Sequence, residues 1–355
     1  MIDATVEVED GNLQVYGAAS MLLGSLVPYG GPISVTGSTV SVQDADLADP
    51  AALGNLLLAT TQAAVTVSDN LLVRADGGLT VITQGMFGNN DVCIVGNADV
   101  RAGRSDGTNT QLGQIAVLTE SLGGPARLAV EGNKITGTAA MALVDIGDGA
   151  HISFVGNELS LGTETTDGQV QLSGGPLGSV IVSGNSGELA GGPVTVIGYP
   201  DGAVAVSDNE IAFTRAVEAL ALRGSGTATV TGNTFTSGDA TPSGVALHVE
   251  ASDGTFTVTA TENEFVGFWG ALSFVGGPAG STSIDAKVND NVFDMEFTAA
   301  PQVAYLESIG DVIDATNNYW GGITDVATLT SYVTKDADTV AWEGDIQLEP
   351  VKATR

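Results

Sequence analysis

The chain has 355 residues, of which 42 are Asp or Glu and only 11 are Lys or Arg, so its formal net charge at pH 7 is −31. A surface with so little positive charge disfavours binding to nucleic acid and to anionic membranes. No apolar run of 18 residues is present, so we expect no insertion into a membrane, and the single cysteine excludes an intrachain disulfide.

The first 30 residues precede the main sequence pattern, and we expect them to form an N-terminal cap or a first coil. Met1 is followed directly by Ile-Asp-Ala-Thr, which lacks the features of a signal peptide. The acidic composition and the scarcity of lysine favour a salt-adapted, halophilic type of protein. We therefore expect an extracellular or cell-surface location, either with a leader removed or as part of a larger surface or virion assembly.

From Ile33 onward, one short phrase recurs about eleven times. It consists of alternating apolar residues, a small or acidic residue, Asn, any residue and a further apolar residue, as in VAVSDNEI at Val204–Ile211. The first copy carries Ser38 in place of Asn, and the recurring asparagines are Asn70, Asn97, Asn133, Asn157, Asn185, Asn209, Asn233, Asn263, Asn291 and Asn318. Their spacing of 24 to 36 residues is typical of stacked repeats.

The apolar residues inside each phrase alternate, which is the periodicity of a β-strand. Val204 and Val206 are expected to face inward, whereas Ala205 and Ser207 face outward. Gly or Asp precedes most of the asparagines, and both residue types tolerate the left-handed backbone of a sharp bend. A further apolar segment follows roughly ten to twelve residues later, so each period predicts two or three short strands.

These periods predict an all-β solenoid of about 11–12 coils, in which each strand pairs with its equivalent about 4.8 Å away. The asparagines are expected to form a buried structural ladder, with each amide bonded to the neighbouring coil. Outward acidic side chains would lie about 5 Å from their equivalents one coil away and repel them, so added salt should stabilise the fold.

Two segments depart from the pattern. Asp44–Thr60 contains ADPAALGNLLLA, which favours a short helix, and Thr328–Trp342 lacks the phrase and should cover the last coil. We therefore predict one β-helix domain over residues 1–355, with 1–30 as N-terminal cap or first coil, 31–322 as repeat coils and 323–355 as C-terminal cap.

The end of the chain carries the most specific signature, with ATNNYWGG at Ala315–Gly322 and DIQLEPV at Asp345–Val351. Together with the repeated phrase, this ending resembles the right-handed parallel β-helix repeat proteins of the pectin-lyase-like superfamily. The resemblance is to their extracellular, non-catalytic type, whose closing coil contains Asn-Asn-x-Trp-Gly, and it covers roughly residues 30–350. The right-handedness of the predicted helix is implied by this resemblance alone.

Sugar-cleaving members of this superfamily use paired carboxylates, a Gly-His-Gly, or a Lys, Arg or Tyr base beside calcium-binding acids, and its epimerases use a Tyr, a His and acidic residues. This chain has no Asp-Asp pair, and its only histidines are His151 and His248, the latter expected in solvent on a sheet face. No catalytic residue is therefore assigned, and an enzyme is the less favoured interpretation.

Four of the eleven basic residues fall within residues 74–127, and they are Arg74, Arg101, Arg104 and Arg127. Arg74 and Arg101 each lie four residues after their Asn, so they should stack in adjacent coils. Such a face could bind the carboxylates of an acidic polysaccharide. The alternative is that these arginines pair with Asp76, Asp99 and Asp106.

Two further candidates are weaker. Phe268 and Trp269 occupy a stretch where the preceding coil is polar, and on an outer loop they could stack on sugar rings or anchor another subunit; packing against a neighbouring loop is the alternative. Asp145 and Asp148 in the sequence DIGDG could hold Ca²⁺ or form a plain acidic turn, and no other cofactor is expected.

The favoured function is a non-enzymatic extracellular or cell-surface scaffold of adhesin type, which binds carbohydrate or self-associates. The alternatives are a polysaccharide lyase, epimerase or glycoside hydrolase of the same superfamily, and a phage or viral fibre component. The missing catalytic sets and the short, regular coils favour the scaffold, because function depends on sites and not on the fold alone.

Overall fold

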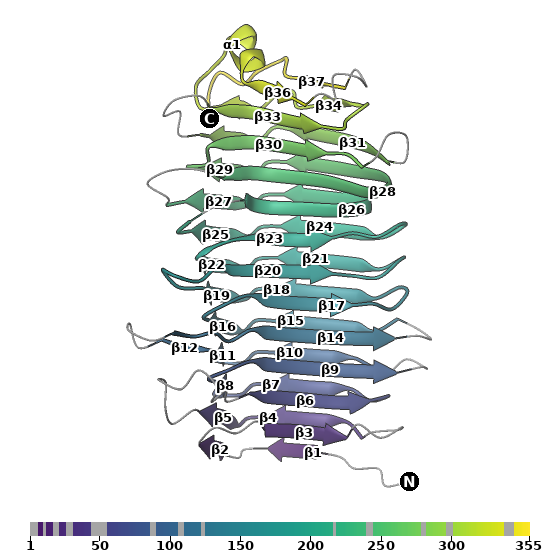
Figure 1. Ribbon diagram of the computed structural model, residues 1–355, viewed down its shortest axis with the longest axis vertical. Helices are drawn as coiled ribbons and strands as arrows, with labels where there is room; N and C mark the ends of the chain where they lie inside the picture. The colour runs from purple at the N-terminus through teal and green to yellow at the C-terminus, as the bar shows by residue number, and fades with distance from the viewer. Residues whose placement is uncertain are drawn as a thin grey trace. The chain divides into compact units, whose positions relative to one another are not determined.

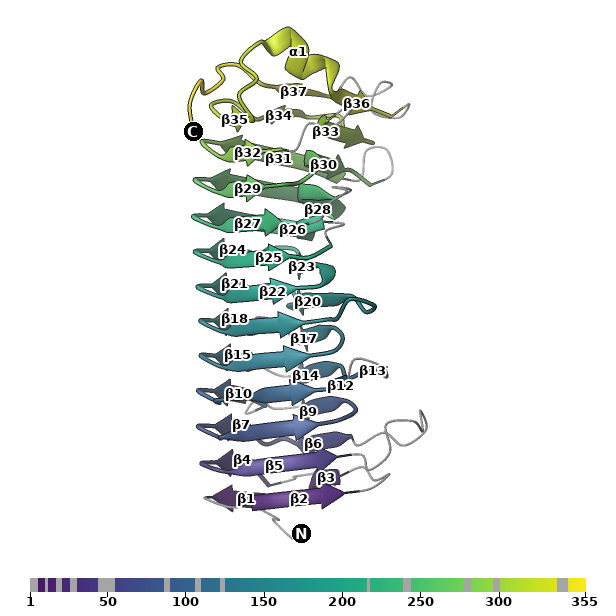
Figure 2. The ribbon, with the colours of Figure 1, turned by 90° about the vertical axis from the view of Figure 1, so that its left-hand side faces the viewer.

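A computed structural model of the chain describes residues 6–9, 12–16, 21–25, 31–43, 55–85, 90–105, 110–121, 125–215, 218–238, 244–277, 282–295, 301–336 and 344–355. The chain divides into two compact units. Unit 1 comprises Met1–Ile181 and Asn185–Ala190, and unit 2 comprises Val182–Gly184 and Gly191–Arg355. Both units consist of short parallel strands stacked coil upon coil (Figures 1 and 2).

Each coil of unit 1 contains three strands, and each strand pairs in parallel with its equivalent in the next coil. The first strands are β1 (Val6–Glu9), β4 (Ile33–Thr36), β7 (Val65–Ser68), β10 (Val92–Val95), β15 (Arg127–Glu131) and β18 (His151–Val155). The second strands are β2 (Asn12–Tyr16), β5 (Thr39–Gln43), β8 (Leu72–Ala75), β11 (Val100–Ala102), β16 (Lys134–Gly137), β19 (Glu158–Leu161) and β22 (Ser186–Leu189). The third strands are β3 (Met21–Ser25), β6 (Leu56–Thr61), β9 (Leu79–Gly85), β14 (Ile115–Ser121), β17 (Met141–Asp145) and β20 (Gly168–Ser173).

Two short strands of unit 1, β12 (Arg104–Ser105) and β13 (Thr110–Gln111), form an antiparallel pair after β11. The strand β21 (Ser179–Ser183) contains the boundary between the two units.

Unit 2 repeats the three-strand coil. Its first strands are β24 (Ala203–Ser207), β31 (Thr282–Asn289), β34 (Val312–Asp314) and β37 (Asp345–Gln347). Its second strands are β25 (Glu210–Phe213), β27 (Thr234–Ser237), β29 (Glu264–Val266), β32 (Val292–Asp294) and β35 (Tyr319–Trp320). Its third strands are β23 (Gly191–Ile197), β30 (Gly270–Val275), β33 (Gln302–Glu307) and β36 (Val333–Lys335). In two coils the third strand runs on into the next first strand, which gives the long strands β26 (Glu218–Thr231) and β28 (Val245–Thr261).

The predicted all-β fold of parallel stacked coils, a β-solenoid, is confirmed. The described second strands, one in each coil, number seven in unit 1 and five in unit 2, which agrees with the 11–12 coils expected. The right-handedness and the single-domain assignment stay predictions.

The bend before each recurring Asn has the left-handed backbone that the Gly or Asp residues predicted. The residue before the Asn has φ between 55° and 68° in every copy, including Gly96, Asp208 and even Glu262. Because this conformation is costly for ordinary side chains, Gly and Asp dominate the position.

The recurring asparagines are buried and joined to one another. In unit 1, the Asn97 side-chain amide donates to Asn133 Oδ1 at 2.8 Å and to the Val67 carbonyl at 2.9 Å. The backbone N–H of Asn97 donates to the same Asn133 Oδ1 at 3.0 Å. Each Asn therefore satisfies two donors of the preceding coil with one oxygen.

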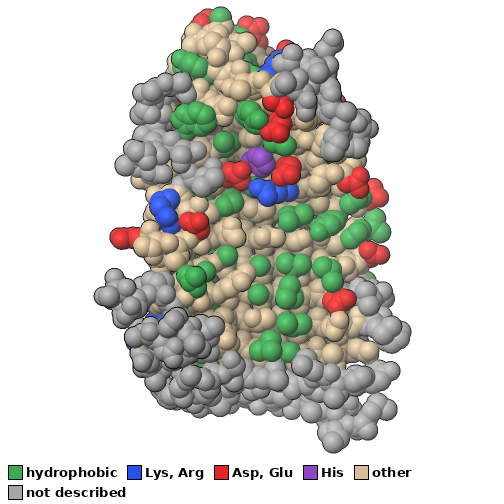
Figure 3. Space-filling view, viewed as in Figure 1, with side chains coloured by type: hydrophobic (Ala, Val, Ile, Leu, Met, Phe, Trp, Pro, Cys, Tyr) green, Lys and Arg blue, Asp and Glu red, His purple; other side chains and the backbone are tan. Residues whose placement is uncertain are grey.

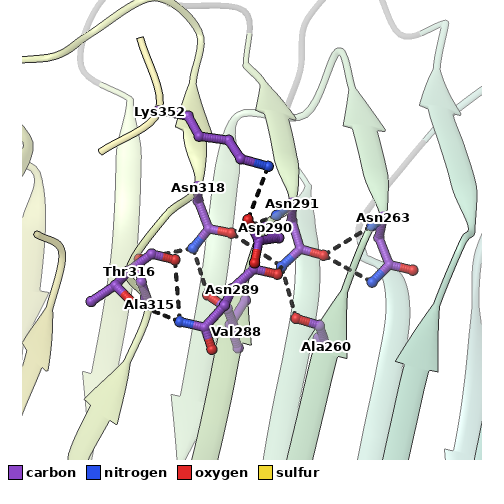
Figure 4. Close-up of polar contacts among 10 residues, drawn as sticks. All are labelled: Ala260, Asn263, Val288, Asn289, Asp290, Asn291, Ala315, Thr316, Asn318 and Lys352. Carbon is purple, nitrogen blue, oxygen red and sulfur yellow. Dashed lines mark hydrogen bonds and ion pairs between the residues drawn. The ribbon is translucent and has the colours of Figure 1, made fainter. Parts of the chain in front are cut away.

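The same pattern recurs from Asn70 to Asn185 in unit 1 and from Asn209 to Asn318 in unit 2. Figure 4 shows its last steps, in which Asn263 donates to Asn291 and Asn291 donates to Asn318. We call these residues the Asn ladder. It keeps buried polar groups paired, so its role is structural.

The inward residues of the second strands form a column in each unit. In unit 1 the column is aliphatic and contains Val73, Val100, Ile135 and Leu159. In unit 2 it is aromatic: Phe235, Phe265, Phe293 and Trp320 lie in register with ring centroids 4.9–5.5 Å apart. The offset stacking that aromatic pairs prefer is thus repeated along the coil axis of unit 2.

The segment expected to form a helix at Asp44–Thr60 is partly described, and there the prediction is wrong: Leu56–Thr61 is strand β6. Leu56 and Leu58 are buried, because β6 pairs in register with β9 and alternates inward and outward residues. Residues 44–54 lie outside the described residues. The tertiary pairing outweighs the local helix propensity.

The described helix, α1 (Val326–Ser331), lies near the C-terminus, with Asp325 as its N-cap and Leu329 buried beneath it. It precedes β36, which pairs with β33, so the segment starting at Thr328 lies against the last coils of unit 2. Within the described part of the chain, no helix is long and apolar enough to span a membrane.

The expectation of stacked acidic side chains is wrong at the level of strand register. Within each unit, the register partner of an Asp or Glu in a described strand is a neutral or basic residue, as for Glu158 with Lys134 and Ser186. Glu250 similarly lies between Arg223 and Val275. Because a neutral or basic residue stands opposite each acidic one in the next coil, two acidic residues in the same column lie at least two coils apart.

Candidate functional site

Two arginines stack on the outer face of the second strands of unit 1. Arg74 in β8 and Arg101 in β11 are register partners, with Ser41 before them and Thr136 after them. Adjacent strands place these two guanidinium groups close together, and like charges directly opposite one another are destabilising. Carboxylates must therefore offset them.

The acids that offset this charge lie one or two residues away. Arg74 donates to Asp76, whose side chain is fully buried, at 2.7 Å, and Arg104 lies at 3.7 Å from the other oxygen of the same carboxylate. Arg101 pairs with Asp99 at 2.6 Å. The alternative pairing with Asp76 and Asp99 is thus present, whereas Asp106 lies outside the described residues.

Among the described residues, these three arginines outnumber the two carboxylates that pair with them. They line a hollow of about 270 Å³ together with hydroxyl-bearing residues of the next coils, Thr136, Thr138, Ser160 and Thr163. The Arg101 Nε is buried and has no hydrogen-bond partner. We call this site the arginine hollow. Guanidinium and hydroxyl donors converging on one hollow can bind a carboxylate or sulfate.

The fourth arginine of the predicted cluster does not reach the hollow. Arg127 belongs to β15, a first strand, and its side chain pairs with Glu131 at 3.3 Å. Its register partner is His151, which contacts the Ser179 hydroxyl at 2.7 Å. The structure therefore brings together three of the four predicted arginines.

The aromatic candidates lie differently from the expectation of an outer loop. Phe268 is buried and packs edge-on against Phe213, with ring centroids 6.1 Å apart. It cannot stack on a sugar without unfolding that contact. Trp269 is half-buried, and its carbonyl accepts a hydrogen bond from the Gln302 N–H.

The proposed calcium pair is split between interior and surface. Asp145 is 1% exposed and accepts a hydrogen bond from the Gly147 N–H at 2.7 Å, whereas Asp148 is exposed. Burial raises the pKa of Asp145, and the bond from Gly147 offsets only part of this. Among the residues that the structure describes, no group of three or more His, Cys, Asp or Glu residues is arranged to hold a metal ion.

A polar cluster that sequence reasoning missed surrounds His248 on the third-strand face of unit 2. The His248 Nδ1 lies 3.1 Å from the Ser273 hydroxyl, and its Nε2 lies 3.7 Å from Glu250. Arg223 lies within 3.7 Å of both Glu218 and Glu250. Figure 3 shows a histidine set among acidic and basic side chains on this face.

The same face continues into the next coil. Ser273 pairs in register with Tyr305, whose hydroxyl donates to Glu307 at 2.8 Å. That hydrogen bond, together with burial, raises the pKa of Tyr305 to about 12. The sequences of the third strands could have revealed this cluster. When LALRG, VALHVE, ALSFV and VAYLE are aligned by register, one column contains His248, Ser273 and Tyr305, and the next outward column contains Arg223, Glu250 and Glu307.

No protein-family model, curated protein or solved structure matches this chain. The fold and the sites described above therefore rest on the chain's own residues.

Proposed function

We propose that the protein is a non-enzymatic extracellular or cell-surface β-solenoid module that binds acidic polysaccharide through the arginine hollow. The observation that supports this proposal is the excess of guanidinium groups among the described residues, three against two carboxylates, in a chain whose net charge is −31. In so acidic a protein, a concentration of its few basic residues around one hollow is unexpected unless an anion is bound there.

The hollow also has the donors that recognition requires. A guanidinium carries five N–H donors, and among the described residues each of these arginines contacts a single carboxylate. Arg74, Arg101 and Arg104 therefore have donors available for a ligand. The hydroxyl groups of Thr136 and Ser160 line the same space and can contact the sugar hydroxyls.

The resemblance to the pectin-lyase-like superfamily is part of the same proposal. The Asn phrase and the Asn-Asn-x-Trp-Gly ending support a right-handed helix of the extracellular, non-catalytic type, and the sealed Asn ladder and short coils fit a scaffold. High salt outside the cell would screen the overall negative charge, so that an anionic chain can approach the protein.

Binding of oligogalacturonate, compared with a neutral oligosaccharide of equal length and measured by calorimetry at fixed salt, tests the proposal. We expect the acidic ligand to bind and the neutral one not to bind. Arg101→Gln should weaken binding about tenfold or more, because a charge-assisted hydrogen bond is worth about 1.5–3 kcal/mol. Arg127→Gln, in the same unit but outside the hollow, is the matched control and should leave binding unchanged. Equal binding by wild type and Arg101→Gln would overturn the proposal.

A second candidate, a carbohydrate-active enzyme, is favoured by one observation. His248, Ser273 and Tyr305 lie in successive coils beside Glu250 and Glu307, so a base, a hydroxyl and a phenol follow one face. Assays for unsaturated products and for reducing ends on pectate, alginate and hyaluronan test it. Turnover that His248→Ala abolishes would replace the scaffold proposal with this one.

A further inference from the structure

The third strands of unit 1 carry an apolar outer face. Ile82 in β9, Leu118 in β14 and Val144 in β17 are register partners in three successive coils, and all three lie on the outward side of their strands. Leu118 is 37% exposed, and Ile146, which directly follows β17, is 59% exposed. We call these four residues the apolar face. Figure 3 shows hydrophobic side chains gathered on this side of the stacked coils.

Charged side chains are scarce around the apolar face. Among the outward residues of the described strands β6, β9, β14, β17 and β20, Glu120 is the one charged residue. The Gln84 amide donates a hydrogen bond to its carboxylate at 2.5 Å, so this charge has a partner. In the third strands of unit 2, by contrast, Arg223, Glu250 and Glu307 face outward. The apolar face can therefore lie against another molecule without burying an unpaired charge.

The apolar face combines a hollow with a projecting side chain. Ile82, Leu118, Val144 and Ile146 all line a hollow of about 250 Å³, and polar residues of β9 and β14 complete its lining. Ile146 is the most exposed of the four, so its side chain is available to enter a hollow on another molecule. A surface that carries both parts is self-complementary, which is what a contact with two-fold symmetry requires.

The size of the face also fits such a contact. The five strands are five to seven residues long, and at about 4.8 Å between strands and 3.3 Å per residue their outer face covers on the order of 500 Å². Two such faces in contact would bury about 1,000 Å² in total, near the lower limit for a specific interface. We therefore expect a weak dimer, with a dissociation constant on the order of micromolar.

We propose that the apolar face is a self-association surface, on which a second copy of this chain packs sheet against sheet about a two-fold axis. Ile146 of each copy enters the hollow of the other and contacts its Leu118. A basic partner would gain more from the acidic surface elsewhere on the chain, whereas an acidic partner can approach closely only where acids are scarce. A second copy meets this condition and also supplies the matching side chain.

Sedimentation velocity of the full chain, over a concentration series that spans the micromolar range, tests the proposal. We expect an equilibrium between monomer and dimer. The fraction of dimer should rise with NaCl, because salt screens the repulsion between two chains that each carry a net charge of −31. No polysaccharide is present in this measurement, so its outcome is independent of the arginine hollow.

Variants test the residues of the contact. Ile146→Glu and Leu118→Glu should each lower the association constant at least about tenfold, because each places a carboxylate in the apolar contact. Leu71→Glu is the matched control: Leu71 is 70% exposed, belongs to the same unit and does not line the hollow. It should leave association unchanged. Thermal melting checks that each variant is folded.

A mixture of two variants tests the two-fold geometry. Ile146→Lys alone and Leu118→Glu alone should both stay monomeric, because each places a charge in the apolar contact on both sides of the axis. An equimolar mixture of the two should recover the dimer. In that mixed dimer the introduced ammonium of one chain lies against the introduced carboxylate of the other, and the second contact keeps its native Ile146 and Leu118.

Three results would overturn the proposal: a monomer at every concentration, an equal loss of association in Leu71→Glu, or a variant mixture that stays monomeric. A monomeric chain that binds vesicles of zwitterionic lipid, and loses this binding in Leu118→Glu, would assign the face to a lipid surface and overturn the proposal as well.

Discussion

At the scale of single residues, Asp145 is the clearest case of a charge held against its preference. Its carboxyl is buried, and the pKa is raised by that burial. Because the pKa of Asp145 is higher in the folded than in the unfolded state, its protonated carboxyl adds to the free energy of unfolding at low pH. This contribution is lost as the pH rises through the pKa of the folded state. At pH values above the ordinary Asp value, this carboxyl therefore makes the folded state less stable than it is at low pH.

We expect Asp145→Asn to raise the urea midpoint at pH 7, because Asn keeps an acceptor for the Gly147 N–H and removes the charge. The difference from wild type should shrink as the pH falls toward 3.8, the ordinary Asp value. Asp148→Asn, at an exposed position, is the control and should change little. A lower midpoint for Asp145→Asn at pH 7 would show that the charge itself is needed there.

A single ladder residue supports two coils. Asn263→Ala would leave the backbone and side-chain N–H groups of Asn233 without an acceptor and the Val230 carbonyl without its amide donor. At about 1–3 kcal/mol for each buried orphaned group, the expected loss is several kcal/mol. Urea titration measures it, and Thr259→Ala, outward on β28, is the matched control. A loss below about 1 kcal/mol would mean that water replaces the amide.

At the scale of elements, the second strands of the two units have different interiors. The aromatic column of unit 2 packs ring on ring, and Phe265 touches two neighbours with centroid distances of 5.5 and 5.3 Å. We expect Phe265→Ala to cost about 3–5 kcal/mol, since the cavity opens on both sides. Phe265→Leu should cost clearly less, and Val266→Ala, the half-buried next residue, least of all. Similar midpoints for the Ala and Leu variants would mean that the column collapses to fill the gap.

The sequence predicts the elements better than the sites. The Asn phrase predicts three features from three local requirements. Alternating apolar residues predict the strand, the Gly or Asp that tolerates a positive φ predicts the bend, and the buried Asn amide predicts the ladder. The helix predicted at Asp44–Thr60 fails where it is described, since pairing of β6 with β9 decides that segment. The cluster around His248 is harder to predict, because it depends on which residues of neighbouring coils are register partners.

At the scale of the whole molecule, the net charge of −31 still causes repulsion among acidic side chains. Strand register removes only the closest contacts, because it places neutral or basic residues opposite the acidic ones. Repulsion between charges further apart is screened by salt, so the folded state should gain from it. We expect the melting temperature to rise with NaCl, most steeply at low concentration. Calorimetric melts across a NaCl series measure this. A flat series would mean that the alternation of charges along the coils already removes the repulsion.

The Asn ladder also has a genetic consequence. Within each unit, each described ladder Asn donates its side-chain amide to the next one. If the residues after one Asn are deleted up to and including the next Asn, the two cut ends are therefore equivalent positions of the repeat. Removing residues 234–263 would place Glu264 and Phe265 after Asn233, where Thr234 and Phe235 now stand, in strands that already share one register. Recombination between the similar phrases can thus add or delete whole coils without a new interface having to arise. We expect alleles of such a gene to differ in length by single periods, with the losses and gains falling at the asparagines.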